Sequence, residues 1–466
     1  MTQHTTTSGV TSSATDPTAA LRAAGLVAHA PGSPEYDLLV SGFNLDNAVS
    51  PAVVVSPASA EDVATTVRVA GELGLGVGVR LTGHGLSPAL DGQVMVHTGR
   101  LDQLSVDPAT RLAHVGAGVV WQQVLDAAAP HGLGAVAGSA PAVSVVGYST
   151  GGGVSPVGRT YGMGVDRVRS FEVVTGDGRL QTASAQENPD LWWALRGGRG
   201  TAGIVTSLEL ELVEQPLLYG GAAFFAAEDL PAVLRAWVTW AAALPTEATT
   251  SVAFMRMPPL PDIPPPLAGR LTLAVRLAWT GLVEEGPAVL APLLAVADPV
   301  LDTTGPLPFA ALGAIHMDPV DPIPAVELST LLGELTDDAV DTLLALAGPE
   351  ADCPQIMIEV RQLGGAMRSG PDAAFVHREA GWTVHTVGLA VPPVREAAEA
   401  HGSALVQALA PWSTGGLLPN FATRADAAWY RAAYGEAGVA RLREVVLAHD
   451  PGNVVTGGRA LRAATD

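Results

Sequence analysis

The sequence predicts an α+β protein built in two parts, and three observations support this class. At 466 residues, of which 48% are hydrophobic, the chain is long enough to bury a large core and to form about two domains. Residues 36–215 alternate between short apolar runs and amphipathic segments. Residues 216–410 combine longer helices with strands of alternating polarity, which is typical of an antiparallel sheet with helices on one face.

The expected division of the chain follows these changes. Residues 1–16 are rich in Thr and Ser and lack an apolar core, so we expect a disordered tail rather than a signal peptide. We expect a first domain over 17–215, an inserted domain over 216–410, and a segment over 411–466 that returns to the first domain. No window of about 18 uninterrupted apolar residues occurs, so we expect a cytoplasmic protein that does not enter a membrane.

The first part shows strand and helix signals in regular succession. A capping sequence at Ser59 precedes an amphipathic helix over 60–73. Gly176-Asp177-Gly178 lies between two apolar runs and predicts a hairpin. The remaining apolar runs predict strands over 52–56, 77–81, 94–96, 112–115, 169–175, 180–183 and 204–212, with helices over 119–129 and 190–195.

In the second part, two strands are predicted to have one polar face. The polar face of 270–279 carries Arg270, Thr272 and Arg276. That of 355–363 carries Gln355, Glu359 and Arg361, while Ile356, Ile358 and Val360 occupy the opposite face. Such a polar face either meets solvent or lines a pocket, and the pattern leaves both open. Helices are predicted over 230–244, 287–297 and 439–448.

Composition excludes several classes of function. All 25 basic residues are arginine, so the chain offers no lysine for a Schiff base or a Walker A phosphate loop. A net charge of -21 argues against nucleic-acid binding, which needs a basic surface. The single cysteine, Cys353, excludes an internal disulfide and a cysteine-ligated metal cluster, and we expect it to be a packed thiol.

Two glycine-rich segments carry the strongest functional signal. Arg80-Leu81-Thr82-Gly83-His84-Gly85 follows an apolar run, so its glycines allow close backbone approach to a ligand and His84 offers a nucleophilic imidazole. Residues 138–153 end in three glycines and offer a run of backbone N–H groups that suits a phosphate and a flat ring. Together the two segments favour a flavin site.

Two shorter motifs have less specific readings. Gly147-Tyr148-Ser149-Thr150-Gly151 matches the nucleophile elbow of hydrolases, with His449 later in the chain, but the glycines after Ser149 are a poor start for the helix that this motif requires. Gly116-Ala117-Gly118 resembles the opening of a dinucleotide-binding fingerprint, but Trp121 stands where the third glycine is needed. A turn between a strand and a helix explains the second motif better.

Several ordered motifs resemble the flavin-linked oxidases of the vanillyl-alcohol-oxidase and berberine-bridge type. They cover residues 45–215 densely and 420–454 more thinly, and comprise Arg80…Gly83-His84, 115–118 with Trp121, 151–153 with Arg159 and 161–162, 173–178, 188–198 and 203–206. The resemblance implies a two-part FAD-binding domain of the PCMH type over 17–215 and 411–466. The inserted α+β domain, built on an antiparallel sheet, would bind the substrate.

The resemblance also implies a role for individual residues. His84 matches the histidine that is bonded to the C8-methyl carbon of the flavin. The remaining expected FAD contacts are Arg80, Leu81, Thr82, Gly83 and Gly85 around the pyrophosphate; Val143, Gly147, Thr150, Gly152 and Gly153 along the ring and ribityl chain; Ile204 and Val205 at the adenosine half; and Asn420, Phe421 and Asn453 from the C-terminal segment. Val145 stands at the position near flavin C4a and is small enough to leave access for oxygen.

Two departures from the family pattern matter. Many relatives carry a cysteine that forms a second flavin bond, whereas this chain has Ala140 there. Cys353 is no substitute by position, so we expect a single covalent link through His84. Relatives that dehydrogenate alcohols often carry a tyrosine two residues before Asn-Phe, and here that residue is Leu418.

The expected chemistry is hydride transfer to flavin N5, coupled to removal of a substrate proton, with O2 reduced to hydrogen peroxide. Glu359 is the first candidate for the proton acceptor because its strand face is polar. Arg361 beside it is expected to lower the pKa of the substrate or of a neighbouring group. Tyr430 completes the expected catalytic set, with Tyr434 and His316 in reserve. The alternative for Glu359 and Arg361 is an ordinary solvated pair.

Three functions remain open from the sequence. The first is an FAD-linked oxidase of a secondary-metabolite alcohol or an oxidative cyclisation substrate. The second is a carbohydrate or oligosaccharide oxidase, which aromatic residues exposed in the inserted domain would favour; Trp237, Trp240 and Trp279 are more consistent with core packing. The third is a flavin-bound cyclase or scaffold without redox chemistry. The expected partners are a small organic substrate and O2, with no metal.

Overall fold

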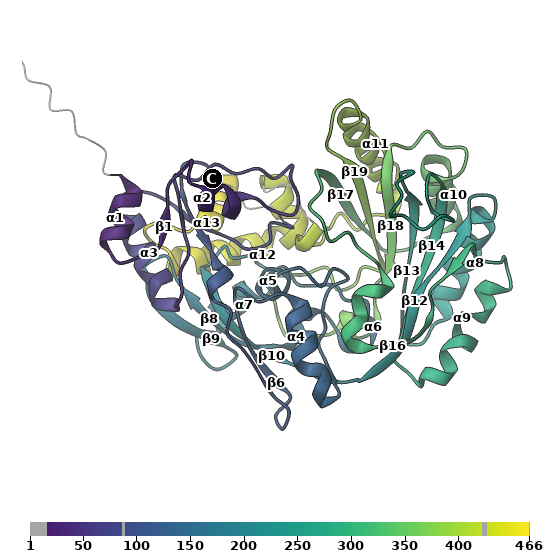
Figure 1. The fold of residues 1–466 in the computed structure, drawn as a ribbon, viewed down its shortest axis with the longest axis horizontal. Coiled ribbons are helices and arrows are strands. Elements are labelled where there is room, and N and C mark those ends of the chain that lie inside the picture. Colours follow the sequence, from purple (N-terminus) through teal and green to yellow (C-terminus); the bar gives the residue numbers. More distant parts are fainter. Residues whose placement is uncertain (1–15, 86–88, 422–425, 466) are drawn as a thin grey trace, which may run out of the picture.

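The computed structural model describes residues 16–85, 89–421 and 426–465. The tail predicted for residues 1–16 lies outside this range except for Asp16, whose side chain accepts a hydrogen bond from Thr18 N at 3.0 Å and caps α1 (Pro17–Ala23). None of the helices in the described ranges is both long and apolar enough to span a bilayer. Figure 1 shows two lobes, with strands β1–β10 on the left and the larger sheet on the right.

Two larger sheets and one two-stranded sheet, in which β7 (Leu133–Gly134) pairs with β11 (Val213–Glu214), form the left lobe. In the first, β2, β4 and β3 run parallel, and α3 (Ala60–Glu72) connects β2 to β3. The second is antiparallel and has the order β5-β6-β10-β8-β9. The predicted strands and hairpin are confirmed by β2 Val53–Val55, β3 Val77–Arg80, β4 Val94–His97, β6 Leu112–Gly116, β8 Val168–Val174, β9 Leu180–Ser184 and β10 Ile204–Glu211. Two further strands, β1 Ala28–His29 and β5 Leu104–Asp107, were not predicted.

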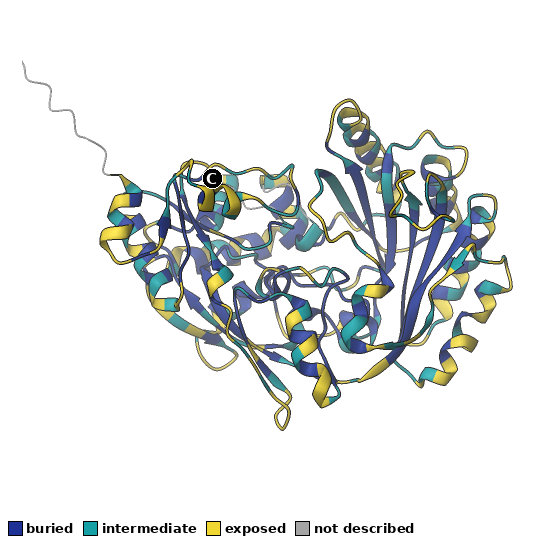
Figure 2. Ribbon diagram, in the orientation of Figure 1, coloured by how far each residue is buried: buried dark blue, intermediate teal, exposed yellow. Residues whose placement is uncertain are grey.

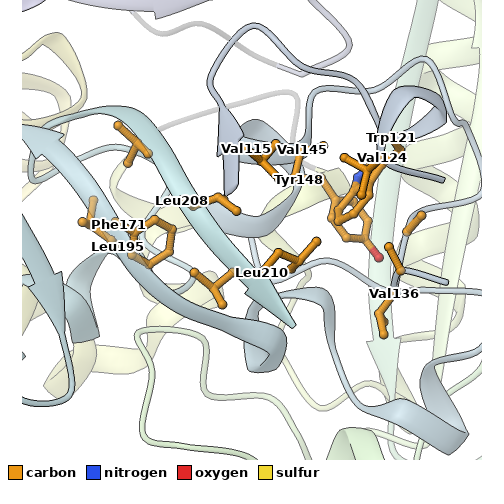
Figure 3. Packing of buried hydrophobic residues seen from close by; sticks show 14 of the residues in the cluster. Val115, Trp121, Val124, Val136, Val145, Tyr148, Phe171, Leu195, Leu208 and Leu210 are labelled. Carbon is orange, nitrogen blue, oxygen red and sulfur yellow. The ribbon is translucent and has the colours of Figure 1, made fainter. Parts of the chain in front are cut away.

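The core of this lobe lies between the antiparallel sheet and several short helices. Val115, Val145 and Leu208 belong to one hydrophobic cluster with Trp121 and Tyr148 (Figure 3). Those two rings pack edge to face, with centroids 5.2 Å apart. The other elements of this part of the chain are α2 Pro34–Val40, α4 Trp121–Ala128, β7 Leu133–Gly134, α5 Val145–Thr150, α6 Gly158–Tyr161, α7 Pro189–Leu195 and β11 Val213–Glu214.

The right lobe is one eight-stranded antiparallel sheet with helices on one face, as predicted. Its order is β15-β12-β14-β13-β18-β19-β17, and β16 pairs with β12. Figure 2 shows its strands buried along most of their length, while the helices expose their outer faces. The bounds are β12 Leu217–Ala226, β13 Ala248–Arg256, β14 Leu271–Trp279, β15 Leu301–Asp302, β16 Gly305–Pro308, β17 Ala325–Leu332, β18 Gln355–Gln362, β19 Trp382–Leu389, α8 Leu230–Ala243, α9 Gly286–Leu294, α10 Asp337–Ala347 and α11 Arg395–Ala408.

A bulge at the start of β18 corrects the predicted faces of this strand. The pairing with β19 shifts register between Gln355 and Met357, so one residue is added and the alternation changes phase there. Gln355 therefore points toward the helices and donates from Nε2 to Ala398 O in α11 at 2.7 Å. Ile356 lines the cavity between the lobes instead of sharing a face with Ile358. Glu359 and Arg361 lie on the cavity-side face, as predicted.

The C-terminal segment returns to the left lobe. Helix α12 (Ala427–His449) is longer than the predicted 439–448. It consists of two helical stretches joined by a kink at Gly435, where φ is 65°, and the prediction covered only part of the second stretch. It packs against α7, and α13 (Thr456–Thr465) packs against β3. The chain thus passes from the right lobe back to the left, which agrees with an insertion, while the exact domain boundaries stay a prediction.

Candidate functional site

One cavity of about 1050 Å³ is lined by both lobes. The left lobe contributes residues 80–85, the start of α5 and residues 199–205. The right lobe contributes the face of β13, β14, β17, β18 and β19 that is not covered by helices. The polar sheet face seen in the sequence therefore lines a pocket rather than meeting bulk solvent.

The segment 80–85 leaves β3 through a turn that only glycine fits. Gly83 has φ of +67°, and a Cβ on it would lie 2.6 Å from the Cα of Gly42. The turn also brings this segment beside Phe43, whose backbone N–H donates to Thr82 O at 2.8 Å. Backbone and side chains of 80–85 thus line the cavity together.

Arg80 holds a buried positive charge at this turn. Its side chain donates from Nη2 to Asn47 O at 3.2 Å, while Nε and Nη1 are buried and have no hydrogen-bond partner among the described residues. Burial lowers the pKa of Arg80. A buried guanidinium that lacks a carboxylate partner suits an anionic ligand such as a pyrophosphate.

His84 lies in the cavity wall as a neutral imidazole. Its ring stacks on Phe43 with centroids 4.1 Å apart, and Nδ1 lies 2.8 Å from Thr82 Oγ1. Burial lowers the pKa of His84 to about 4, against the opposing effect of the Glu327 and Asp318 carboxylates. Its Nε2 is buried and has no partner within the described ranges. An unprotonated imidazole is the form that acts as a nucleophile.

The second glycine-rich segment contributes to the same cavity through α5. Ser144 caps this helix by accepting from Gly147 N at 3.2 Å, and Val143, Gly147 and Thr150 line the cavity. The C-terminal segment closes onto it through Asn420, which accepts from Gly153 N at 2.8 Å and donates to Tyr148 O at 3.0 Å. Residues far apart in the sequence are therefore joined by two hydrogen bonds.

Four of the expected FAD contacts do not line the cavity. Val145 packs in the hydrophobic core because it faces inward at the start of α5 (Figure 3), so its size does not bear on oxygen access from the cavity. Gly153 donates its N–H to Asn420, and a Cβ on Gly153 would lie 2.4 Å from the Tyr148 ring. A Cβ on Gly152 would lie 3.9 Å from Oδ1 of Asn420. Asn453 has a positive φ of 54° and a buried Oδ1 without a partner among the described residues.

Ser149 is not placed as the nucleophile of a hydrolase. A nucleophile elbow requires a strand, a sharp turn and then a helix. Ser149 instead lies inside α5, is fully buried and has no imidazole within hydrogen-bond distance among the described residues.

The right lobe places a cluster of charged side chains on its cavity face. Glu359 is fully buried and lies 2.6 Å from both Arg276 Nη1 and Arg361 Nε. Ser251 donates to Glu359 Oε1 at 2.9 Å, and Nε2 of His316 lies 3.3 Å from the same oxygen. Arg361 also donates from Nη2 to Ser139 Oγ at 3.3 Å, next to Ala140.

These contacts make Glu359 a permanently charged partner for the arginines. Burial alone raises the pKa of Glu359, but the guanidiniums of Arg361 and Arg276, together with His316, outweigh this effect and hold the pKa well below its usual range. Both carboxylate oxygens are occupied, and Glu359 does not line the cavity itself. The alternative of a solvated surface pair is wrong, and this geometry favours positioning of Arg361 over proton removal.

A histidine on the neighbouring strand, not among the predicted site residues, also faces this cluster. His385 in β19 stands directly opposite Glu359 in β18. It is 7% exposed, its ring nitrogens form no hydrogen bond within the described ranges, and its Nε2 lies 3.8 Å from Glu327 Oε2. The centroid of the His385 ring lies 4.7 Å from the centroid of the Phe421 ring. The alternation in Trp382–Leu389, with His385 among β-branched residues, is the signal that identifies this strand.

Tyr430 lies elsewhere in the cavity wall, apart from the charged cluster. Its ring packs against the rings of Trp429 and Tyr434, and burial raises its pKa to about 12, against the effect of Arg199. Leu418, at the position where relatives often have tyrosine, is 1% exposed and packs with Leu331 and Leu363. No phenol therefore joins Glu359 and Arg361 from either position.

The structure thus brings most of the predicted site residues to one cavity. Those that line it are Arg80, Leu81, Thr82, Gly83, His84, Gly85, Val143, Gly147, Thr150, Ile204, Val205, Asn420, Phe421, Arg361 and Tyr430. The lining residues that were not predicted include Phe43, Arg199, Glu327 and His385, while Arg276 comes from the polar face predicted for 270–279. Cys353, the predicted packed thiol, is free and partly buried, and burial raises its pKa.

The comparisons with known proteins agree with this geometry. Residues 51–184 match the family model described as an FAD binding domain. A FAD-dependent monooxygenase of Penicillium roqueforti, prx3, is 34% identical over 198 residues, which cover 42% of this chain and 39% of that protein. The chain thus spans about two fifths of the length of this curated relative.

Two solved structures share the whole fold. BBE-like 1 of Physcomitrella patens superposes with a TM-score of 0.81 at 20% identity, covering 94% of this chain and 97% of that chain. Glucooligosaccharide oxidase of Acremonium strictum, described with a 6-S-cysteinyl, 8α-N1-histidyl FAD, has a TM-score of 0.80 at 21% identity and covers 94% and 97%.

Proposed function

The chain carries the FAD-binding domain of this group of flavoproteins, and on that premise we propose that it is an FAD-dependent oxidase of a small organic molecule. The observation that carries the proposal is His84, a neutral histidine whose Nε2 has no partner among the described residues and which lines a cavity shared by both lobes. When bound, FAD supplies hydride acceptance at N5 and transfer of the electrons to O2, giving hydrogen peroxide.

The residues around His84 fit this cofactor. The unpaired nitrogens of the buried Arg80 guanidinium match an anionic pyrophosphate. Gly83 has a positive φ and lets the turn pass close to Gly42 and to the Arg80 guanidinium, which keeps this segment in the cavity wall. Val143, Gly147 and Thr150 on one side and Ile204 and Val205 on the other would hold the remainder of the cofactor.

We propose a single covalent link, through His84. The cavity holds Ala140 where many relatives have a second, cysteinyl attachment. The only thiol of the chain, Cys353, packs on the opposite side of the large sheet, at the helix-side core. The glucooligosaccharide oxidase described above carries one cysteinyl and one histidyl link. We expect the cofactor of this chain to differ from it mainly by lacking the cysteinyl link.

The charged cluster of the right lobe would hold the reacting part of the substrate. Arg361, kept charged and oriented by Glu359, offers hydrogen-bond donors beside Ser139. His385 faces the cavity with a carboxylate partner, Glu327, and both of its ring nitrogens are available among the described residues. We therefore assign proton acceptance to His385, substrate orientation to Arg361, and positioning to Glu359.

The direct test is the visible spectrum of the purified protein, followed by acid precipitation. We expect flavin absorption in the native protein and a yellow pellet after precipitation, because a covalent cofactor stays with the denatured chain. A yellow supernatant would retain FAD and contradict the covalent link. Protein that is colourless and takes up no added FAD would contradict the proposed function. Peroxide formation on addition of candidate substrates then separates an oxidase from a flavin-bound cyclase.

The pH dependence of cofactor attachment follows from the state of His84. Because the pKa of His84 is lowered to about 4, the imidazole stays neutral as the pH falls from 8 to 5. We expect the rate at which apoprotein becomes covalently labelled by FAD to change less than about threefold over this range, and to fall tenfold for each unit below pH 4. A loss centred near pH 6.5 would show that His84 titrates as a solvent-exposed histidine.

A further inference from the structure

The cavity face of the right lobe changes from polar to aliphatic along the strands. The registers define cross-strand rows. Glu359 pairs with His385, and Ser251 pairs with Arg361, which makes these two rows polar. The next row away from them is Met255–Met357–Val387. Side chains two residues apart on a strand are separated by about 6.5 Å, so the aliphatic row follows the polar rows immediately.

The bulge in β18 extends the aliphatic surface. Because the register shifts between Gln355 and Met357, Ile356 and Met357 both line the cavity, although they are consecutive in the sequence. An unbulged strand would have pointed one of them toward the helices. Leu389, two residues beyond Val387 on β19, adds to the same surface.

Aliphatic side chains continue from these rows to the opening of the cavity. Leu260 and Ile263, in the proline-rich loop after β13, line the cavity, and Leu260 is 55% exposed. Across from them, Met317 and Val320 lie in the loop before β17 and are 47% and 77% exposed. Both loops therefore expose large aliphatic side chains to solvent. A ligand that passes through the opening would cover these side chains.

The cavity side of the right lobe carries no aromatic platform. Among its described lining residues there is no tryptophan, tyrosine or phenylalanine. Trp237 and Trp279 pack in the core on the helix side instead. A sugar chain lying along Met255, Met357 and Val387 would press hydroxyl groups against aliphatic side chains, and such burial is unfavourable. Three polar lining residues next to this surface, Asp262, Asp318 and Asp321, lie on the two loops and not on the strands.

On this basis we propose that the substrate is an amphiphile, with a polar oxidisable head at the Arg361–His385 rows and an aliphatic or alicyclic tail along Met255, Met357 and Val387 toward Leu260. The inference rests on the proposed function for the identity of the head site. The unbranched, polarisable methionines allow the tail surface to adapt to different shapes, so tails of several lengths bind.

The test uses 4-n-alkylphenols from ethyl to octyl as probes, titrated into the FAD-containing protein by calorimetry. We expect the dissociation constant to fall about fourfold for each methylene that is buried. The Met357→Gln variant, which keeps the side-chain length but adds an amide, should reduce this factor to below about twofold, with little change for ethylphenol. Leu447→Gln is the matched control, because Leu447 is 49% exposed on α12 and lies outside the cavity lining.

Three results would overturn the inference: affinity that is independent of chain length, an unchanged chain-length dependence in Met357→Gln, or cellotriose binding more tightly than octylphenol. Leu260→Gln at the exposed opening provides a second variant if Met357→Gln does not fold, and should weaken only the longest probes. The flavin spectrum separates the two proposals. Protein without flavin contradicts the proposed function, whereas flavin-containing protein that ignores chain length contradicts only the amphiphilic substrate.

Discussion

Replacing His84 by alanine is expected to abolish covalent attachment of the flavin completely. Ala140 lines the cavity where many relatives have the cysteine of a second link, so we expect no attachment through a thiol. In denaturing gels the variant should lose the ultraviolet-excited flavin fluorescence of the wild-type band, and its acid-precipitated pellet should be colourless. Because Arg80 and the backbone of 80–85 remain, we expect FAD to bind non-covalently, with a native spectrum that is lost on precipitation.

The control for this substitution is His114→Ala. His114 lies on β6 and is exposed, so its loss should leave the fluorescent band unchanged. Thr82→Val addresses the orientation of the imidazole, because Thr82 Oγ1 lies 2.8 Å from His84 Nδ1. We expect slower labelling of this variant with the same final extent. A His84→Ala protein that keeps its fluorescent band would show that another residue carries the link.

Replacing Glu359 by glutamine is expected to lower the free energy of unfolding by about 3–5 kcal/mol. The substitution removes the carboxylate that two buried arginines share, and leaves Arg276 and Arg361 without a counter-charge in the cluster. Urea denaturation of both proteins measures the difference. Glu214→Gln serves as the matched control: its pair with Arg111 has side chains that are 77% and 54% exposed, so we expect a change below about 1 kcal/mol.

Acid provides an independent check of the same interaction. The pKa of Glu359 is held well below its usual range in the folded protein, whereas in the unfolded chain it is about 4.3. Its contribution to stability is therefore complete above about pH 4.3 and is lost as the pH falls toward the folded value. The Glu359→Gln protein lacks this contribution and should show a shallower loss of stability below that pH. Equal acid profiles would contradict the ionised state of Glu359.

Glu359→Gln and His385→Asn together separate the possible roles of the charged cluster. If Glu359 removed the substrate proton, the glutamine variant would bind FAD and fold normally but reduce the flavin about a hundredfold more slowly. The geometry instead predicts a large loss of stability, because both carboxylate oxygens are engaged by arginine. His385→Asn, which removes no ion-pair partner of Arg276 or Arg361, is the variant expected to slow reduction with little change in stability.

The sequence by itself determined the local structure and most of the left-lobe wall of the cavity. Gly83 and His84 lie within one short segment, so their relation is fixed by a turn that needs a positive φ, and this is visible in the residue types. The strands of the left lobe and the hairpin at Gly176-Asp177-Gly178 likewise depend on short-range patterns, and their bounds were predicted to within a few residues.

Only the tertiary structure decided which polar groups meet on the right-lobe wall of the cavity. The local pattern is that of a solvated strand residue at Glu359, and only the fold places Arg276 from β14 and His316 from the segment between β16 and β17 against it. The bulge at Gln355 is a property of pairing with β19 and leaves no mark in the alternation, so the faces of Gln355 and Ile356 were wrong. Val145 was misplaced for a related reason, since α5 turns it into the core and leaves Val146 toward the cavity. Local patterns specify turns and strand identity because these depend on neighbouring residues, whereas ion pairs and register are set by chain segments that meet only after folding.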